Sequence, residues 1–413
     1  MTAAERLLQY VRISTDSTEG VKTSPTSERQ WDLARMLQQE MERLGLSRVR
    51  LADNCVVYGE LPATPGCESV EPVGFLAHID TAPAFSGIGV KPQVIEHYDG
   101  GPVALGDSGL TLDAERFPHL TQLRGKTLIT TDGTTLLGAD DKAGVAEILT
   151  MVEQLIEQKI PHGKVAVAFT PDEEVGLGAH GVDIGWMGVP VAYTVDGGAV
   201  GELEYETFNA ASAEVTIEGV SVHTGSAKGI MRNALLVAME FNALLPDEIP
   251  ANTEGYEGFY HLDRMSGSVA RATLGYILRD HDRTKFEQRK QTVERAVETI
   301  NAKYGQGTAT AEISDTYYNM EEKIRPHFYL IERAKAAMEK LGVTPCISPV
   351  RGGTDGSILS YRGLPCPNLC TGGYGFHGPW EHITAEDMDC CVGILLGIVA
   401  EFAAAGNEPG TCG

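Results

Sequence analysis

Four apolar segments of the chain each run directly into an acidic residue or a histidine. They are Ala77–Pro83 (AHIDTAP), Leu136–Gly144 (LLGADDKAG), Phe169–Gly176 (FTPDEEVG) and Tyr193–Gly198 (YTVDGG). A charged side chain at the end of a buried strand is costly unless it is paired or bound to a metal ion. Ligands of open α/β sheets bind beyond the carboxyl ends of the strands. The pattern therefore predicts an α/β sheet whose strand ends bring these segments together at one crevice.

The surrounding sequence also favours an α/β fold. Continuous apolar runs, which are typical of strands covered on both faces, occur at 73–77, 165–169 and 191–195. A helix is predicted over Ser27–Leu44, where Ser27 and Gln30 form a capping-box pattern, and a second over Lys142–Ile156. Strands that alternate with helices predict a largely parallel sheet.

The pattern changes near Phe208. From Ala213–Ile217 to Thr308–Ile313 the chain reads as strand, helix, two strands, helix and strand, which is the ferredoxin-like order. The α/β pattern returns after Tyr317. We therefore predict one α/β domain made of residues 1–207 and 319–413, interrupted by an inserted α+β domain over residues 208–318.

The charge balance excludes several kinds of partner. Lys plus Arg is 33 and Asp plus Glu is 57, which gives a net charge of −24. Such a surface repels phosphate backbones and anionic lipid, so no nucleic-acid or membrane partner is expected.

The apolar stretch Cys391–Ala400 is about half a membrane span and predicts a buried helix. Charged residues near the N-terminus leave no signal core, and the eight cysteines include no C-x-x-C pair. Reduced thiols in the cytoplasm are the expectation.

The strand-end segments together supply a set of possible metal ligands. Its members are acids and histidines, namely His78, Asp80, Asp140, Asp141, Glu173, Glu174 and Asp196, and a glycine-rich loop adds His377 and His382. Each segment alone has an ordinary interpretation, such as a histidine bonded to a carboxylate, helix N-terminal charges or a turn. Clustered carboxylates, however, need a compensating cation. Carboxylate and imidazole ligands without thiolate suit zinc, cobalt or manganese.

In order and spacing, these segments resemble the co-catalytic di-zinc metallopeptidases, a group that also contains aminoacylases and succinyl-diaminopimelate desuccinylase. The longer strings at Ile129–Gly144, Ala168–Gly176, Thr253–Leu262 (TEGYEGFYHL) and Arg351–Gly356 (RGGTDG) resemble the group's tripeptide aminopeptidases. The resemblance covers nearly the whole chain. It implies a zinc-exopeptidase-like mixed sheet flanked by helices, with the inserted ferredoxin-like domain acting as a lid.

The resemblance also assigns ligands to two zinc ions, for which cobalt or manganese could substitute. It implies that His78 and Asp196 bind one ion, that Glu174 and His377 bind the other, and that Asp140 bridges both. A bridging carboxylate suits this chemistry, because two cations about 3.5–4 Å apart can share a water that becomes a hydroxide near neutral pH.

Three further residues receive roles in catalysis. Asp80 would take the other N–H of the metal-binding imidazole and fix its tautomer, and Glu173 would be the general base. In relatives the bond that follows the bridging residue, Asp140, is often cis. His223 stands where relatives have a histidine that stabilises the oxyanion, although a surface histidine is an equal alternative. Thr224 follows it where proline is common, which puts the shape of that loop in doubt.

Two arginines are candidates for binding the carboxylate of a substrate. Arg279 and Arg351 could each pair with it in bidentate fashion. The alternative for either is an intramolecular salt bridge, with Asp280, Asp282 or Asp355.

The function expected from this resemblance is metal-dependent release of the N-terminal residue from tripeptides. A deacylase of N-acyl amino acids from the same group is the nearest alternative, because both reactions use a hydroxide on a carbonyl. A peptide-binding relative without catalysis is a third alternative, although such a protein has no need of Glu173. The resemblance leaves open whether the chain forms a homodimer.

Overall fold

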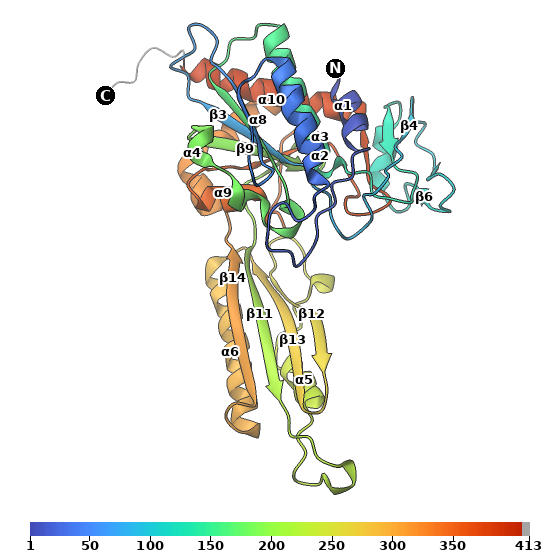
Figure 1. Cartoon of the computed structure of the whole chain (residues 1–413), viewed down its shortest axis with the longest axis vertical. Helices are drawn as coiled ribbons and strands as arrows, with labels where there is room; N and C mark the ends of the chain where they lie inside the picture. The colour runs from blue at the N-terminus through green and yellow to red at the C-terminus, as the bar shows by residue number, and fades with distance from the viewer. Residues whose placement is uncertain (407–413) are drawn as a thin grey trace. The chain divides into compact units, whose positions relative to one another are not determined.

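The computed structural model describes residues 1–406 and divides the chain into two compact units. Unit 1 comprises Met1–Tyr205, Glu322–Ser348 and the chain from Thr354 onward, and unit 2 comprises Glu206–Glu321 and Pro349–Gly353. The sequence suggested one insertion over 208–318 and gave no sign that Pro349–Gly353 groups with it. Each unit has its own sheet and helices (Figure 1).

An eight-stranded mixed sheet forms the centre of unit 1, with strand order β1-β2-β8-β3-β9-β16-β10-β15. The four central strands, β8, β3, β9 and β16, run parallel, whereas β2 and β10 join them antiparallel. The strand bounds are β1 Ser47–Leu51, β2 Val57–Leu61, β3 Val73–His78, β8 Val165–Thr170, β9 Val191–Gly197, β10 Glu202–Glu204, β15 Cys346–Ile347 and β16 Asn368–Cys370. The expected mixed sheet is confirmed.

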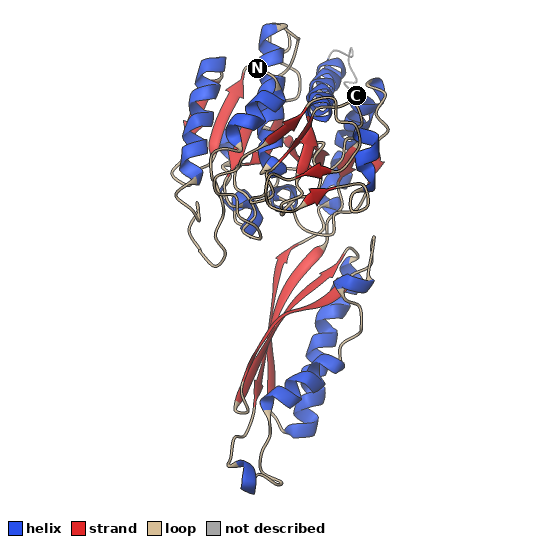
Figure 2. Ribbon diagram, turned by 90° about the vertical axis from the view of Figure 1, so that its right-hand side faces the viewer, coloured by secondary structure: helices blue, strands red, loops and turns tan. Residues whose placement is uncertain are grey.

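Helices lie on both faces of this sheet (Figure 2). The α-helices that lie wholly or mostly in unit 1 are α1 Ala3–Tyr10, α2 Gln30–Leu44, α3 Ala139–Glu157, α4 Ile184–Met187, α7 Glu321–Ile324, α8 Tyr329–Lys340, α9 Asp355–Tyr361 and α10 Ala385–Gly406. Every residue of β3 and β8 is buried, which explains why their sequences are continuously apolar instead of alternating.

Two smaller sheets complete the described part of unit 1. One contains β17, β7 and β4 in that order, and the other pairs β5 with β6. Their bounds are β4 Gln93–Ile95, β5 Val103–Ala104, β6 Thr111–Leu112, β7 Leu128–Thr130 and β17 His382–Thr384.

Helix α2 begins later than the sequence predicted. It starts at Gln30, and its N-cap residue Arg29 makes no side-chain capping bond. The side chain of Gln30 donates instead to Asp172 Oδ1 at 2.7 Å. The capping box expected between Ser27 and Gln30 is therefore wrong, because a distant buried carboxylate takes the glutamine. The predicted glycine stop is confirmed, since Gly45 adopts a left-handed φ of 87°.

Helix α10 contains the apolar stretch that was expected to be buried. By length and composition alone it could cross a membrane, but half of its most apolar window is buried inside the fold. It packs against α8 and α3, and Ile394, Leu395 and Ile398 are almost fully buried. This is the arrangement of a core helix.

Unit 2 has the expected ferredoxin-like topology. Its sheet has the order β12-β13-β11-β14, and all three strand pairs are antiparallel. The elements are β11 Asn209–Glu218, α5 Ala234–Ala243, β12 Phe259–Gly267, β13 Arg271–Asp280, α6 Arg283–Tyr304 and β14 Ala309–Tyr317. Phe241 of α5 and Phe286 and Val293 of α6 join the buried face of this sheet in one core.

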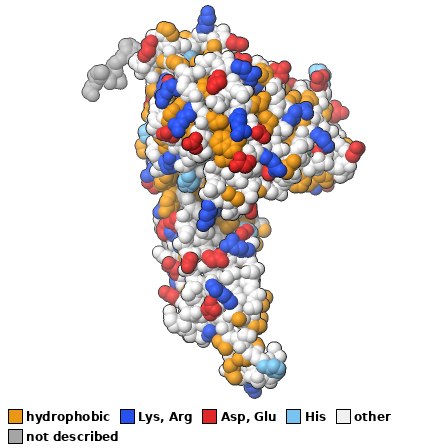
Figure 3. Space-filling view, in the orientation of Figure 1, with side chains coloured by type: hydrophobic (Ala, Val, Ile, Leu, Met, Phe, Trp, Pro, Cys, Tyr) orange, Lys and Arg blue, Asp and Glu red, His pale blue; other side chains and the backbone are white. Residues whose placement is uncertain are grey.

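On one face of the molecule the acidic side chains are not gathered into one patch. In the face shown by Figure 3, Asp and Glu side chains are interspersed with Lys and Arg. The acids of unit 1 that are buried, such as Asp80 and Asp141, differ from these exposed acids and need a separate explanation.

Candidate metal centre

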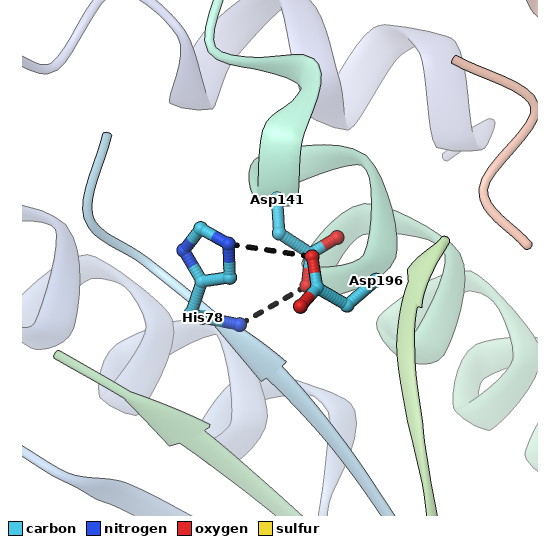
Figure 4. Close-up of side chains that lie close together, drawn as sticks. All are labelled: His78, Asp141 and Asp196. Atoms are coloured by element: carbon cyan, nitrogen blue, oxygen red, sulfur yellow. Dashed lines mark hydrogen bonds and ion pairs between the residues drawn. The ribbon is translucent and has the colours of Figure 1, made fainter. Parts of the chain in front are cut away.

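The carboxyl ends of β3 and β9 bring His78 and Asp196 together. Nε2 of His78 lies 3.3 Å from Oδ1 of Asp196, and the His78 side chain is only 2% exposed. Figure 4 shows the imidazole directed at the Asp196 carboxylate, with Asp141 beside them at the start of α3. Two neighbouring parallel strands thus deliver an imidazole and a carboxylate to one point, as the position of ligands in α/β sheets requires.

Asp140 lies between the two predicted histidine ligands. Its Oδ1 is 3.0 Å from Nε2 of His78, and its Oδ2 is 3.0 Å from Nε2 of His377. The backbone at Asp140 departs from helical geometry, with φ −83° and ψ 105°, and its bond to Asp141 is cis, as the resemblance implied. One carboxylate therefore directs its two oxygens at two different imidazoles.

Glu174 and His377 form the other half of the cluster. Oε1 of Glu174 lies 3.1 Å from Nε2 of His377. Glu174 belongs to a short 3₁₀ turn after β8, and His377 lies in a loop with a left-handed φ of 62°. His382, the other histidine of that region, faces His119 instead, with 2.9 Å between the Nε2 atoms.

Asp141 was a candidate by sequence, and its carboxylate does lie near the cluster. One possible ligand group in the described residues is His78, Asp141 and Asp196, and another is His78, Asp140 and Glu174. The Asp141 carboxylate, however, accepts the backbone N–H groups of His78 and Gly144 at 3.1 Å each. These bonds hold the end of β3 against the start of α3 and give Asp141 a structural task.

Asp80 connects the imidazole of His78 with the turn that carries the paired glutamates. Nδ1 of His78 lies 3.3 Å from Oδ1 of Asp80 and 3.1 Å from its backbone oxygen. The same carboxylate accepts the backbone N–H of Glu173 at 3.0 Å and of Glu174 at 3.2 Å. A proton on Nδ1 that is donated to Asp80 leaves the Nε2 lone pair free for a cation. The sequence suggested this orienting role but not the support of the turn.

The crowding of these groups changes their pKa values. Hydrogen bonds to Asp140 and Glu174 raise the pKa of His377 to about 11. Burial works against a charge on His78, but Asp196 and Asp140 outweigh it and raise the pKa of His78 well above its ordinary value. Burial raises the pKa of Asp196 to about 7, although His78 opposes that change. The buried carboxylates therefore depend on nearby positive charge.

The ligand set fits two divalent cations. The ion pairs recorded for Asp140, Asp196 and Glu174 in the described chain are with the two imidazoles. All the donor atoms are carboxylate oxygens or imidazole nitrogens, which zinc, cobalt and manganese accept. The bridging position of Asp140 supplies one oxygen to each half of the cluster.

Glu173 follows Asp172 in the same turn; Asp172 is fully buried and Glu173 is half-buried. Burial, and then the charge of Asp196, raise the pKa of Glu173 well above its ordinary value. Asp172, at a left-handed φ of 60°, accepts hydrogen bonds from Ser24, Thr26 and Gln30. The turn with the two glutamates is thereby held from both sides.

Three buried acids organise this region, a role that the sequence analysis assigned to none of them. They are Asp172, Asp355 and Glu381, which accept hydrogen bonds from neighbouring segments. The Asp355 carboxylate, for example, binds Thr170 Oγ1 at 2.8 Å and Ala179 N at 2.9 Å. Glu381 lies between His377 and His382 in the glycine-rich loop, so the sequence does place it in a segment with predicted ligands.

The remaining predicted residues belong to unit 2. His223 is exposed, and its Nδ1 accepts the N–H of Gly225 at 3.1 Å. Arg279 donates to the backbone oxygens of Leu278 and Ala211 and lies over the ring of Tyr317. None of these contacts is a salt bridge.

Arg351 also has partners that the sequence did not predict. Its guanidinium donates to the backbone oxygens of Gly255 and Glu257 and to Thr253 Oγ1, at 2.8–2.9 Å. It therefore holds the loop TEGYEG that precedes β12. The carboxylate partners suggested by sequence are engaged elsewhere, since Asp280 pairs with Arg289 at 2.8 Å. The roles of these arginines in substrate binding stay predictions.

Comparisons with known proteins identify the family of the chain. Residues 131–401 match the family model described as Peptidase family M20/M25/M40. The chain belongs to this family of peptidases.

Within the family, relatives about 50% identical to this chain are named Peptidase T. Peptidase T of Halothermothrix orenii is 50% identical over 402 residues, covering 97% of this chain and 98% of that protein. Peptidase T of Bacillus subtilis is 49% identical over 403 residues, with the same coverage. The crystal structure of aminopeptidase PepT from Bacillus cereus has a TM-score of 0.77 at 26% identity, covering 97% of this chain and 98% of that one.

Proposed function

We propose that this chain is a tripeptide aminopeptidase that holds two zinc ions and releases the N-terminal residue of a tripeptide. The observation that carries the proposal is Asp140, whose two oxygens lie 3.0 Å from His78 and His377. The near-full-length similarity to proteins named Peptidase T supports the choice of substrate. Cobalt or manganese could take the place of zinc at such ligands.

The residues divide between holding the ions and moving a proton. His78 and Asp196 would hold one ion, Glu174 and His377 the other, and Asp140 both. When bound, the two cations would polarise the scissile carbonyl and lower the pKa of a water toward neutrality.

Glu173 would accept the proton of the attacking water and deliver it to the leaving amine. Its position supports this role, because its backbone N–H is fixed by Asp80 and the ligand Glu174 is the next residue. Asp80 would keep the His78 tautomer that leaves Nε2 unprotonated. Glu173 would thus move the proton of the water, and Asp80 would hold the proton on Nδ1 of His78.

We also propose that the protein acts in the cytoplasm, on peptides and without nucleic-acid or membrane partners. The net charge of −24 supports this, as do the free thiols of the seven described cysteines. Cys412 lies outside the described residues. A homodimer is compatible with the proposal.

One assay distinguishes the candidate functions. Purified protein is given a free tripeptide or its N-acetylated form, with and without exhaustive chelation. Release of the first residue from the free tripeptide alone, abolished by the chelator and restored by zinc, supports the aminopeptidase. Preference for the acetylated form would indicate the deacylase, and binding without hydrolysis would indicate the non-catalytic relative. Full activity after chelation would refute the metal mechanism.

A further inference from the structure

Glu381 is a buried carboxylate with an unusual set of partners. It precedes β17 and is 1% exposed. Its Oε2 accepts the backbone N–H of Leu137 at 2.7 Å and of Gly138 at 2.8 Å, and its Oε1 accepts that of Asp140 at 2.9 Å. Both oxygens are thus used by one short segment of backbone.

That segment is the start of α3, where the chain needs an acceptor. The first N–H groups of a helix have no partner within the helix. The N-cap residue is Gly138, which makes no side-chain capping bond. Glu381 supplies the missing acceptor from elsewhere in the chain, and charge-assisted hydrogen bonds are roughly twice as strong as neutral ones.

The same residue is tied to the loop of His377. Its backbone N–H donates to Gly378 at 3.3 Å, which closes a turn directly after His377. Thr130 Oγ1 donates to its backbone oxygen at 3.1 Å and fixes it to β7. Glu381 therefore touches the backbone of Asp140 through its side chain and belongs to the loop of His377 through its main chain.

We propose that Glu381 is a positioning residue that sets Asp140 and His377 at the spacing needed to share metal ions. The proposal rests on the proposed two-metal function. We assign Glu381 neither a ligand nor a catalytic role, because both its oxygens accept hydrogen bonds from backbone donors and it belongs to neither possible ligand group of the described residues. It acts through Asp140, whose carboxylate can face both imidazoles only while its backbone is held.

The test replaces Glu381 by glutamine and measures metal binding directly. Glu381→Gln keeps the shape but presents an amide N–H₂ to backbone N–H groups. We expect the affinity for Co²⁺, measured by competition with a chromophoric chelator, to fall ~10–100-fold, as for residues that orient metal ligands. The visible absorption of bound Co²⁺ should also change, since it reports the ligand geometry.

Glu40→Gln provides the matched control. Glu40 is also buried in unit 1 and accepts Arg6 Nε at 2.8 Å and Tyr10 Oη at 2.6 Å, but its donors belong to no ligand loop. This variant should lose thermal stability and keep the affinity and spectrum of the wild type. Should glutamine at 381 prevent folding, as judged by near-ultraviolet circular dichroism, Glu381→Asp is measured by the same criteria.

Three results would overturn the proposal. The first is wild-type affinity and an unchanged Co²⁺ spectrum in the folded variant at 381. The second is an equal loss of affinity in Glu40→Gln, which would show that general destabilisation suffices. The third is wild-type protein that binds no Co²⁺, which would refute the proposed function itself and the positioning role with it.

Discussion

Replacing Asp80 by asparagine should show how much a residue that supports the predicted ligands, without being one of them, contributes to activity. In the wild type, the Asp80 carboxylate serves three groups: the His78 imidazole at 3.3 Å, Glu173 N at 3.0 Å and Glu174 N at 3.2 Å. Asparagine has one carbonyl oxygen and one amide nitrogen in the same space. At least one of the three groups must then lose its acceptor.

The structure allows the effect to be estimated. A hydrogen bond to a charged group contributes about 1.5–3 kcal/mol, and a buried donor left unsatisfied costs about 1–3 kcal/mol. A change of about 1.4 kcal/mol is tenfold. The loss of one such contact at Asp80 should therefore lower kcat/KM ~10–100-fold, because both the ligand tautomer and the turn with Glu173 are disturbed.

The assay compares kcat/KM and metal content of Asp80→Asn with those of Asp387→Asn. Asp387 is also buried and accepts Lys126 Nζ at 2.5 Å and Thr384 Oγ1 at 2.7 Å, none of which belongs to the site. We expect both variants to lose similar thermal stability. Only Asp80→Asn should lose kcat/KM. Wild-type kcat/KM in Asp80→Asn would refute the reasoning.

Further substitutions test other parts of the chain. Glu173→Gln should lower kcat ~10²–10⁴-fold without loss of metal, and Glu174→Gln should weaken metal binding. Equal metal loss in both variants would show that the roles of the two glutamates are assigned wrongly. Burial raises the pKa of Glu204 from 4.5 to about 7, so its contribution to stability is present below pH about 4.5 and is lost as pH rises through about 7. Near pH 8, Glu204→Gln should raise the free energy of unfolding, measured in urea, by at most about 3 kcal/mol. An equal gain in the free energy of unfolding at low pH would contradict this. Arg279→Ala should raise KM ~10–100-fold for a free tripeptide but leave KM for the tripeptide amide unchanged. Arg351→Ala should change KM for both substrates alike, because Arg351 holds a loop. A rise in KM for the free tripeptide alone in Arg351→Ala would contradict this.

The fold could be predicted largely because its signals are local and periodic. The continuous apolar character of β3 and β8 follows from burial on both faces, and the strand-helix order of unit 2 follows from alternating and helical patterns. The error at the start of α2 has a different cause. Gln30 matched a local capping pattern, but Asp172, more than a hundred residues later, competes for the same side chain and wins.

The same distinction explains which parts of the site the sequence could indicate. Predicted ligands such as His78 and Asp140 stand out because a charge that directly follows an apolar segment is locally improbable. Glu381 carries no such local signal, since its meaning lies in the backbone N–H groups of a segment far earlier in the chain. Arg351 shows the converse, because a motif made it a candidate for substrate binding, whereas its hydrogen-bond partners are two backbone oxygens and the Thr253 hydroxyl of its own unit. Residues that act through main-chain groups become visible only when the fold places those groups.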